Sequence, residues 1–209
     1  MILLNYSKLN GAEFIPHLDM LKHLTRILRR MNVKVNYSQG FNPHALIFMS
    51  SPIALGLKSE SEYCLIDTDE NVIGFKQKFN ACAPKGIRCI NVYEATKKVS
   101  IAAHITSATY EITGLNKFDV NEVLKSDTFV ITDKNSKQKE VRDKIISLSY
   151  NGDTLVATLK FGNDTLRPDY LVAKLKSIYG GERVDVIKKS VQFKENLDVL
   201  SYLEQIKCQ

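Results

Sequence analysis

The chain has 209 residues, a formal net charge of +6 at pH 7, and a composition that is 44% hydrophobic and 25% charged. These values exclude a disordered tail, because they are typical of a globular protein with enough apolar residues for one large core or two small ones. No apolar run approaches the roughly 18 residues of a membrane-spanning helix. The first residues lack the basic region and cleavage site of a signal peptide. We therefore expect a cytoplasmic protein without a membrane segment.

Hydrophobic periodicity in the first half predicts strands and helices in a recognisable order. The expected elements are a strand at 2–8, a helix at 18–31, strands near 33–37, 45–53 and 61–67, a helix at 70–81 and a strand at 87–94. This order suggests a ferredoxin-like βαββαβ module with an extra or broken strand. We assign the module to residues 1–98.

The same order of elements recurs after a connector at 97–104. The expected elements are a strand at 105–113, a helix at 116–126, a strand at 128–133, a hairpin at 144–161, a helix at 167–180, a strand at 183–193 and a terminal helix at 196–206. Asn151 and Gly152 suit the positive φ angles of a tight hairpin turn. The predicted fold class is therefore α+β, with two tandem ferredoxin-like modules, mainly antiparallel sheets and a second module at 105–209.

The cysteine spacing excludes two kinds of metal centre. The four cysteines, which form no CxxC pair, are Cys64, Cys82, Cys89 and Cys208. A zinc ribbon is therefore excluded, and so is the CxxxCxxC pattern that holds the iron–sulfur cluster of a radical SAM enzyme. We expect reduced, mostly structural thiols and no cofactor.

Most of the positive charge lies in the first half of the chain. Residues 1–104 contain 13 Lys and Arg against 8 Asp and Glu, whereas residues 105–209 contain 16 against 15. Most of the excess precedes residue 45. A local concentration of cations can attract phosphate, and a solvated basic surface without a ligand is the alternative.

The predicted helix at 18–31 carries an apolar stripe and a basic stripe. Met20, Leu24 and Ile27 follow the spacing of one helical face and are expected in the core. The basic stripe contributes three candidate phosphate-binding residues, Arg26, Arg29 and Arg30. Guanidinium groups bind phosphate oxygens in bidentate fashion, so three arginines on one helix indicate contact with phosphate more strongly than three lysines.

The loop that follows combines turn formers with side chains suited to nucleotides. Gly40 can adopt a positive φ and Pro43 restricts the residue before it, so we expect an ordered, non-helical loop. The candidate nucleic-acid contacts in the loop are Tyr37, Ser38, Phe41, Asn42 and His44. The aromatic rings can stack on a base, and the polar groups can bind base edges or phosphate. Alternatively, Phe41 fills the core beneath the loop and His44 binds a backbone carbonyl.

The same segment also contains residues suited to catalysis or to metal binding. His17 and His44 can act as acid or base, with Asp19 as an orienting carboxylate. His17, Asp19, His23 and His44 are also of the right types for a metal site. No HxxxH pair is present, and the six-residue separation of His17 and His23 places them on different sides of a helix, so we expect no metal.

Residues 8–63 resemble a known family. The matching elements are His17-Leu18-Asp19, Arg29-Arg30, the run "YSQGFNPH" at 37–44, and Leu55-Gly56 with Ser59 and Glu62. They are similar to motifs of the radical SAM-linked proteins, a bacterial domain family of unknown function in which serine usually stands in place of Pro16. The resemblance implies a protein fused to, or encoded beside, a cobalamin-type radical SAM protein, often near a ribonuclease of the E/G type. It therefore implies work on or near RNA.

Charge, loop chemistry and resemblance together predict a non-catalytic RNA-binding or substrate-presenting partner of a radical SAM enzyme. The expected RNA is tRNA or rRNA, with phosphates on the three arginines and a nucleotide on the loop. Two alternatives stay open. One is a metal-independent RNA-processing enzyme that uses His17 or His44, and the other is a protein-interaction module whose basic helix docks on an acidic surface.

Overall fold

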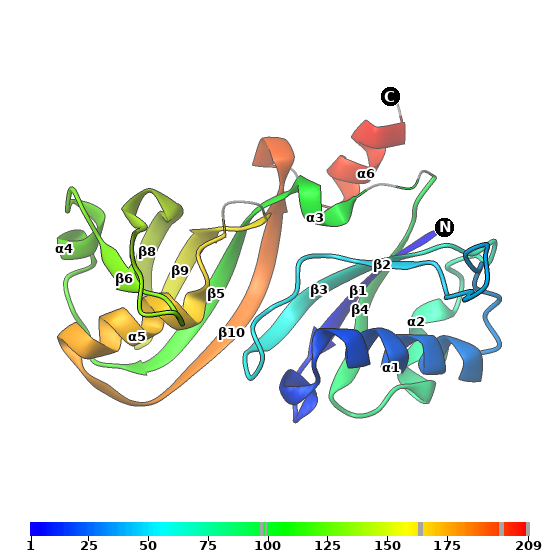
Figure 1. Ribbon diagram of the computed structural model, residues 1–209, viewed down its shortest axis with the longest axis horizontal. Helices are drawn as coiled ribbons and strands as arrows, with labels where there is room; N and C mark the ends of the chain where they lie inside the picture. The colour runs from blue at the N-terminus through cyan, green and yellow to red at the C-terminus, as the bar shows by residue number, and fades with distance from the viewer. Residues whose placement is uncertain (97, 99, 163–164, 197–198, 208–209) are drawn as a thin grey trace. The chain divides into compact units, whose positions relative to one another are not determined.

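The computed structural model describes residues 1–96, 98, 100–162, 165–196 and 199–207 (Figure 1). The chain divides into two compact units. The first unit comprises Met1–His104 together with the chain from Phe193 onward, and the second comprises Ile105–Gln192. Some sequence expectations fall outside the described residues, namely positions 97 and 99 of the connector, positions 197 and 198 of the terminal helix, and the Cys208 thiol.

The first unit is built on antiparallel strands. They are β1 (Ile2–Lys8), β2 (Ile47–Met49), β3 (Lys58–Ile66) and β4 (Ile87–Glu94). β1 lies between β4 and β3, and β2 also pairs with β3. The register places Leu4 opposite Cys64 on one side and Val92 on the other. Every residue of β1 is buried, as expected for a strand paired on both edges and covered on both faces.

Two helices cover one face of these strands (Figure 1). They are α1 (His17–Arg30) and α2 (Phe75–Cys82). The predicted apolar stripe of α1 is confirmed, since Met20, Leu24 and Ile27 are buried against the alternate residues of β1, β3 and β4 that face this side. Burial of each such side chain stabilises the fold by roughly 1.5–3 kcal/mol relative to exposure. This packing fixes the rotation of α1 about its axis.

The other face of the first unit is covered by the end of the chain. Tyr63 of β3 packs edge-on against Phe193, with 5.7 Å between ring centroids, and Phe193 stacks on Tyr202 at 4.7 Å. Tyr202 belongs to α6 (Val199–Lys207), and its ring also contacts His104 at the end of α3 (Ile101–His104). These aromatic contacts explain why the chain from Phe193 belongs to the first unit, whereas the predicted second module runs to residue 209.

Two predicted strands, at 33–37 and 45–53, are mostly absent. In this segment the structure contains the short strand β2, two isolated bridges at Val35–Thr68 and Tyr37–Ala45, and scattered backbone hydrogen bonds, but no continuous ladder over either predicted range. Gly40, with φ of 118°, and Pro43, which lacks an N–H donor, interrupt the ladder between the two runs.

The second helix also begins later than predicted. The sequence pattern predicts a start at residue 70, whereas α2 begins at Phe75. Gly74 adopts a left-handed φ of 67°, and the Asn71 side chain accepts a hydrogen bond from the Ile73 N–H at 2.9 Å. The segment before Phe75 is therefore a turn, because an asparagine side chain competes with the helix for backbone donors.

The second unit contains a four-stranded arrangement with an inserted hairpin. Its elements are β5 (Ile105–Leu115), α4 (Val120–Leu124), β6 (Val130–Thr132), β7 (Gln138–Glu140), β8 (Ile145–Asn151), β9 (Thr154–Lys160), α5 (Pro168–Tyr179) and β10 (Gly181–Phe193). The strand order is β10-β5-β9-β8, and β6 and β7 form a separate two-stranded sheet. The short 3-10 helix η2 (Arg142–Lys144) lies in this unit, whereas η1 (Ala12–Phe14) and η4 (Lys194–Asn196) lie in the first unit.

The β8–β9 hairpin is confirmed at its predicted turn, where Gly152 has a φ of 60°. The helix predicted at 116–126 is shorter, because the Asp119 side chain caps the N–H of Asn121 and α4 ends at Leu124. β7 was not predicted. Its residues are all exposed and polar, so hydrophobic alternation gives no signal for it.

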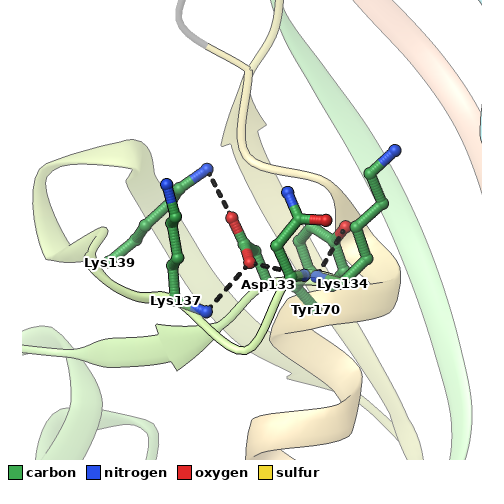
Figure 2. Close-up of polar contacts among 6 residues, drawn as sticks. Asp133, Lys134, Lys137, Lys139 and Tyr170 are labelled. Atoms are coloured by element: carbon green, nitrogen blue, oxygen red, sulfur yellow. Dashed lines mark hydrogen bonds and ion pairs between the residues drawn. The ribbon is translucent and has the colours of Figure 1, made fainter.

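The turn between β6 and β7 is organised by one carboxylate, as Figure 2 shows. Asp133 accepts hydrogen bonds from the backbone N–H groups of Asn135 and Lys137, and it pairs with Lys139 at 2.9 Å. The hydrogen bond from Lys139, followed by those from the two backbone N–H groups, lowers the pKa of Asp133 to about 2. The Tyr170 hydroxyl of α5 accepts a further bond from the Lys134 N–H at 3.3 Å.

The chain thus has a mixed α/β fold with mainly antiparallel pairing. Among the described residues, no helix combines the length and the apolar character that crossing a membrane requires.

A methyl group at Gly86 would disrupt the segment that leads into α1. The Gly86 carbonyl accepts a hydrogen bond from the Leu9 N–H at 2.9 Å. A Cβ there would lie 2.3 Å from the Leu9 oxygen and 2.8 Å from the Ala12 Cβ. We expect Gly86→Ala to destabilise the protein by about 1–3 kcal/mol through this overlap. Urea unfolding should show the loss, and unchanged stability would contradict the close approach.

The Asp133 carboxylate should make stability depend on pH in the acid range. Because its pKa is lower in the folded state, its contribution is complete above the ordinary aspartate pKa and is lost as pH falls through about 2. Asp133→Asn should therefore unfold at lower urea than the wild type at pH 6, and the difference should shrink toward pH 2. Exposed Asp127→Asn is the control, and a difference independent of pH would contradict the interpretation.

Candidate nucleic-acid interface

The ends of α1 fix which residues the helix presents. At its start, Pro16 is non-helical and its carbonyl accepts the Met20 N–H at 2.8 Å. At its end, Asn32 adopts a left-handed φ of 57°, while its N–H bonds to the Arg29 carbonyl and the Val33 N–H to the Leu28 carbonyl. This pair of bonds is the Schellman arrangement that terminates helices. It places the basic last turn directly before the chain returns toward the loop.

The cations of α1 are not equivalent. The Lys22 ammonium pairs with Asp19 at 2.9 Å, and this hydrogen bond lowers the pKa of Asp19. Arg30 donates to the Cys82 carbonyl at the end of α2, at 3.4 Å. The side chains of Arg26 and Arg29 are exposed, and neither guanidinium group forms a hydrogen bond or an ion pair with another described residue. These two guanidinium groups are therefore the ones whose hydrogen-bonding capacity is available to a ligand.

The loop at 37–45 is held as a defined turn. The Ser38 N–H donates to the His44 carbonyl at 2.9 Å, inside the bridge between Tyr37 and Ala45. Gly40 takes its positive φ at the tip, where a Cβ would meet nothing within 4 Å. Glycine is therefore favoured at position 40 by the positive φ angle and not by a lack of space for a side chain.

A contact between Ser38 and His44 orients the imidazole. The Ser38 Oγ accepts the His44 backbone N–H at 3.1 Å and lies 2.8 Å from the ring Nδ1. When the hydroxyl donates to Nδ1, the ring proton sits on Nε2, and that nitrogen can donate to a phosphate or a base. The sequence also allowed an interpretation in which the His44 ring binds a backbone carbonyl. The structure shows the ring beside the Ser38 hydroxyl instead.

The helix and the loop enclose a groove of about 350 Å³. We call it the α1 groove. Its lining residues are Leu21, Lys22, Thr25, Arg26, Arg29, Tyr37, Pro43, His44 and Ala45. Four residues selected from the sequence thus line one hollow, namely Arg26, Arg29, Tyr37 and His44. Guanidinium groups on one wall and a ring with a hydrogen-bond donor on the other suit an anionic ligand with a flat group.

Phe41 lies at the tip of the loop and is fully exposed. The alternative in which this ring fills the core beneath the loop is therefore wrong. Asn42, beside it, is also exposed. An exposed phenylalanine on an ordered loop is suited to stacking on another ring, because little conformational freedom is lost on contact.

The remaining predicted site residues lie elsewhere. Arg30 faces α2, as its bond to Cys82 shows, and does not line the groove. His17 lines a different hollow at the first turn of α1. Asp19 pairs with Lys22 and orients neither histidine. Within the described residues, no group of three or more His, Cys, Asp or Glu side chains is arranged to hold a metal ion.

The hollow that His17 lines contains ionisable residues that the sequence reasoning did not select. They are Tyr6 and Lys8 of β1 and Glu62 of β3. Burial, followed by the nearby Glu62 carboxylate and Cys64, raises the pKa of Tyr6 well above its ordinary value. A signal was present in the sequence, since Lys8 and Glu62 are charged residues within strands of otherwise buried character.

The cysteines among the described residues, Cys64, Cys82 and Cys89, are free thiols, and Cys64 and Cys89 are buried. Burial raises the pKa of Cys64, and burial also raises the pKa of Cys89 to about 11. Both thiols are therefore protonated at neutral pH and are poor nucleophiles.

Comparison with known proteins gives one family. A family model described as "Uncharacterized protein conserved in bacteria (DUF2344)" matches residues 1–168, which include every residue of the α1 groove. The expectation of an uncharacterised bacterial family is thereby confirmed, and the link to radical SAM proteins stays a prediction. No curated protein matches the chain.

Proposed function

The chain belongs to this uncharacterised bacterial family, and we propose that it is a non-catalytic RNA-binding protein that presents RNA to a radical SAM enzyme. The α1 groove is the observation that supports this function. Arg26 and Arg29 lie on one wall, Tyr37 and His44 on the other, and exposed Phe41 stands on the same loop. Guanidinium groups bind phosphate oxygens well, and aromatic rings stack on bases, so the two kinds of side chain together suit an RNA strand.

Single-stranded or loop RNA fits these groups better than duplex RNA. Bases in a duplex are stacked and cannot reach a protruding phenylalanine, whereas bases of loops and ends can be splayed out. The proposed substrate is therefore an exposed loop of tRNA or rRNA. The motifs of residues 8–63 that resemble radical SAM-linked proteins support the enzyme partner.

We also infer that both units have ferredoxin-like topology. In the first unit the order β4-β1-β3-β2, with antiparallel pairing and helices after β1 and β3, supports this description. In the second unit the order β10-β5-β9-β8 repeats that arrangement when the β6–β7 hairpin is treated as an insertion. Similar sheets bind RNA in other proteins, which is an analogy of fold alone.

An RNA-processing enzyme is less well supported. A histidine that acts as general base is commonly oriented by a carboxylate, which also stabilises the imidazolium that forms, and His44 is oriented by a serine hydroxyl instead. His17 lines a separate hollow, so the two histidines do not form one acid–base site there.

Removing the two available arginines should weaken RNA binding and its salt dependence together. We expect Arg26→Ala with Arg29→Ala to lower affinity for a single-stranded RNA by at least about tenfold, because each lost bond to a charged group is worth about 1.5–3 kcal/mol. The slope of log affinity against log salt should become shallower by about 1.4, at about 0.7 per phosphate contact. Fluorescence anisotropy of labelled RNA at several salt concentrations measures both.

The matched control is Lys76→Ala with Lys78→Ala, which removes the same charge from exposed positions of α2. It should leave the slope almost unchanged. Equal losses in the two double variants would mean that binding follows net charge and not the groove. Binding of an acidic polypeptide as tightly as RNA would favour a protein partner instead.

Truncating the exposed ring should weaken binding without changing the salt slope. We expect Phe41→Ala to cost about 1–3 kcal/mol, or about 5- to 150-fold in affinity, since stacking on one base is worth that much. Ile73→Ala, at another exposed apolar side chain of the first unit, is the control and should bind as the wild type does. A wild-type affinity for Phe41→Ala would remove the stacking contact from the proposal.

A further inference from the structure

A second hollow, which we call the inner pocket, lies at the first turn of α1. Its volume is about 240 Å³. Apolar side chains make up most of its lining, including Met20 of α1, Met49 of β2, and Ile53 and Leu55 of the segment after β2. Exposed His17 also lines the pocket and connects it with the surface.

Three polar groups of the sheet also line the inner pocket. Tyr6 is 1% exposed, Lys8 is 6% exposed and Glu62 is 4% exposed. The register of β1 and β3 pairs Tyr6 with Glu62 and Lys8 with Ser59, and the side chains of Tyr6, Lys8 and Glu62 line the same hollow. Keeping ionisable groups out of water costs several kcal/mol each, and a hollow that gathers them among apolar walls is typical of a recognition site.

The inner pocket and the α1 groove lie along the same stretch of helix and chain. α1 borders both, with His17 and Met20 at the inner pocket and Arg26 and Arg29 at the groove. The chain after the loop also borders both, from Pro43 at the groove to Leu55 at the pocket. His17 and Arg26 are roughly 13 Å apart along the helix, at a rise of about 1.5 Å per residue. A short RNA segment can span that length.

We propose that the inner pocket binds an unstacked guanine base of the RNA whose phosphates lie on Arg26 and Arg29. This inference rests on the proposed function, and it adds the identity of the base. The guanine edge would face Lys8 and Glu62, and the purine faces would lie against the methionine side chains.

The donor pattern of guanine distinguishes it from the other bases. Its pairing edge has an O6 acceptor beside two donors, N1–H and the N2 amine. The two oxygens of Glu62 can accept both donors, and the Lys8 ammonium can donate to O6. Adenine, cytosine and uracil each offer a carboxylate only one donor group on that edge. The buried Tyr6 hydroxyl, whose pKa is raised, stays protonated and can donate to a base acceptor.

The methyl NMR signals of the four methionines of the chain can report directly on binding in the inner pocket. Met20 and Met49 line the inner pocket, whereas Met1 and Met31 do not. The full chain labelled at the methionine methyl carbons would be titrated with the 5′-monophosphates of guanosine, inosine, adenosine, cytidine and uridine, and methyl NMR signals recorded. Methionine-to-leucine variants assign the signals. Inosine monophosphate is the matched ligand, because it lacks only the N2 amine.

Guanosine monophosphate should shift the Met20 and Met49 signals and leave those of Met1 and Met31 in place. Inosine monophosphate should bind about tenfold more weakly or worse, as expected for one lost bond to a charged group. Glu62→Gln should weaken guanosine monophosphate by a similar factor and abolish the difference between the two ligands. Absence of any shift at Met20 and Met49, or equal affinity for all five nucleotides, would overturn the proposal. If Glu62→Gln does not fold, the affinities of the wild type for guanosine and inosine monophosphates test the proposal, and equal affinities overturn it.

A second experiment distinguishes failure of the inner-pocket proposal from failure of the proposed RNA-binding function. Affinities of an oligouridine and of the same oligomer with one internal guanosine would be compared on the wild type, Glu62→Gln and the Arg26, Arg29 double alanine variant. The guanosine should raise affinity in the wild type and the arginine variant but not in Glu62→Gln. RNA binding without guanine preference overturns the inner-pocket proposal and leaves the proposed function. Guanosine monophosphate binding without RNA binding assigns the pocket to a free guanine nucleotide and overturns the proposed function.

Discussion

Burial of one face of α1 against the sheet is the constraint on which the rest of the site depends. Met20, Leu24 and Ile27 fill the core between the helix and β1, β3 and β4, so the helix cannot rotate about its axis without exposing them. Because residues of a helix keep fixed angular positions, the same burial directs Arg26 and Arg29 toward the loop. The Schellman ending at Asn32 then returns the chain toward the arginines. Core packing and the placement of the two exposed arginines are thus consequences of one amphipathic pattern.

The loop adds a second kind of order, made by hydrogen bonds. Two contacts between Ser38 and His44, and the bridge between Tyr37 and Ala45, hold it without a continuous strand ladder. A loop ordered in advance loses little entropy when a ligand binds, which favours exposed rings such as Phe41 as contacts. The proposed RNA contacts therefore combine arginines set by a rigid helix with side chains set by a closed turn.

Local signals allowed part of this to be predicted. The 3.6-residue period gave α1 and its basic side, and the residues 37–44 were correctly expected to form an ordered loop. Contacts between distant segments were not predictable, which is why the sequence pattern groups Arg30 with Arg26 and Arg29 although Arg30 bonds to the carbonyl of Cys82. The inner pocket was missed for the same reason, since Lys8 and Glu62 line one hollow only when β1 and β3 pair. Sequence alternation likewise overestimated the strands around Gly40 and Pro43, where backbone geometry outweighs composition.

RNA binding at the α1 groove can be located by ultraviolet crosslinking of RNA to the full protein, followed by tryptic digestion and mass spectrometry. The sequence places residues 35–58 in one tryptic peptide, because no Lys or Arg lies between Lys34 and Lys58. That peptide carries Tyr37 and Phe41, and we expect the crosslinked nucleotides to concentrate there, on one of these two rings. Crosslinks confined to the second unit, or spread evenly over the exposed lysine-rich surfaces, would contradict it.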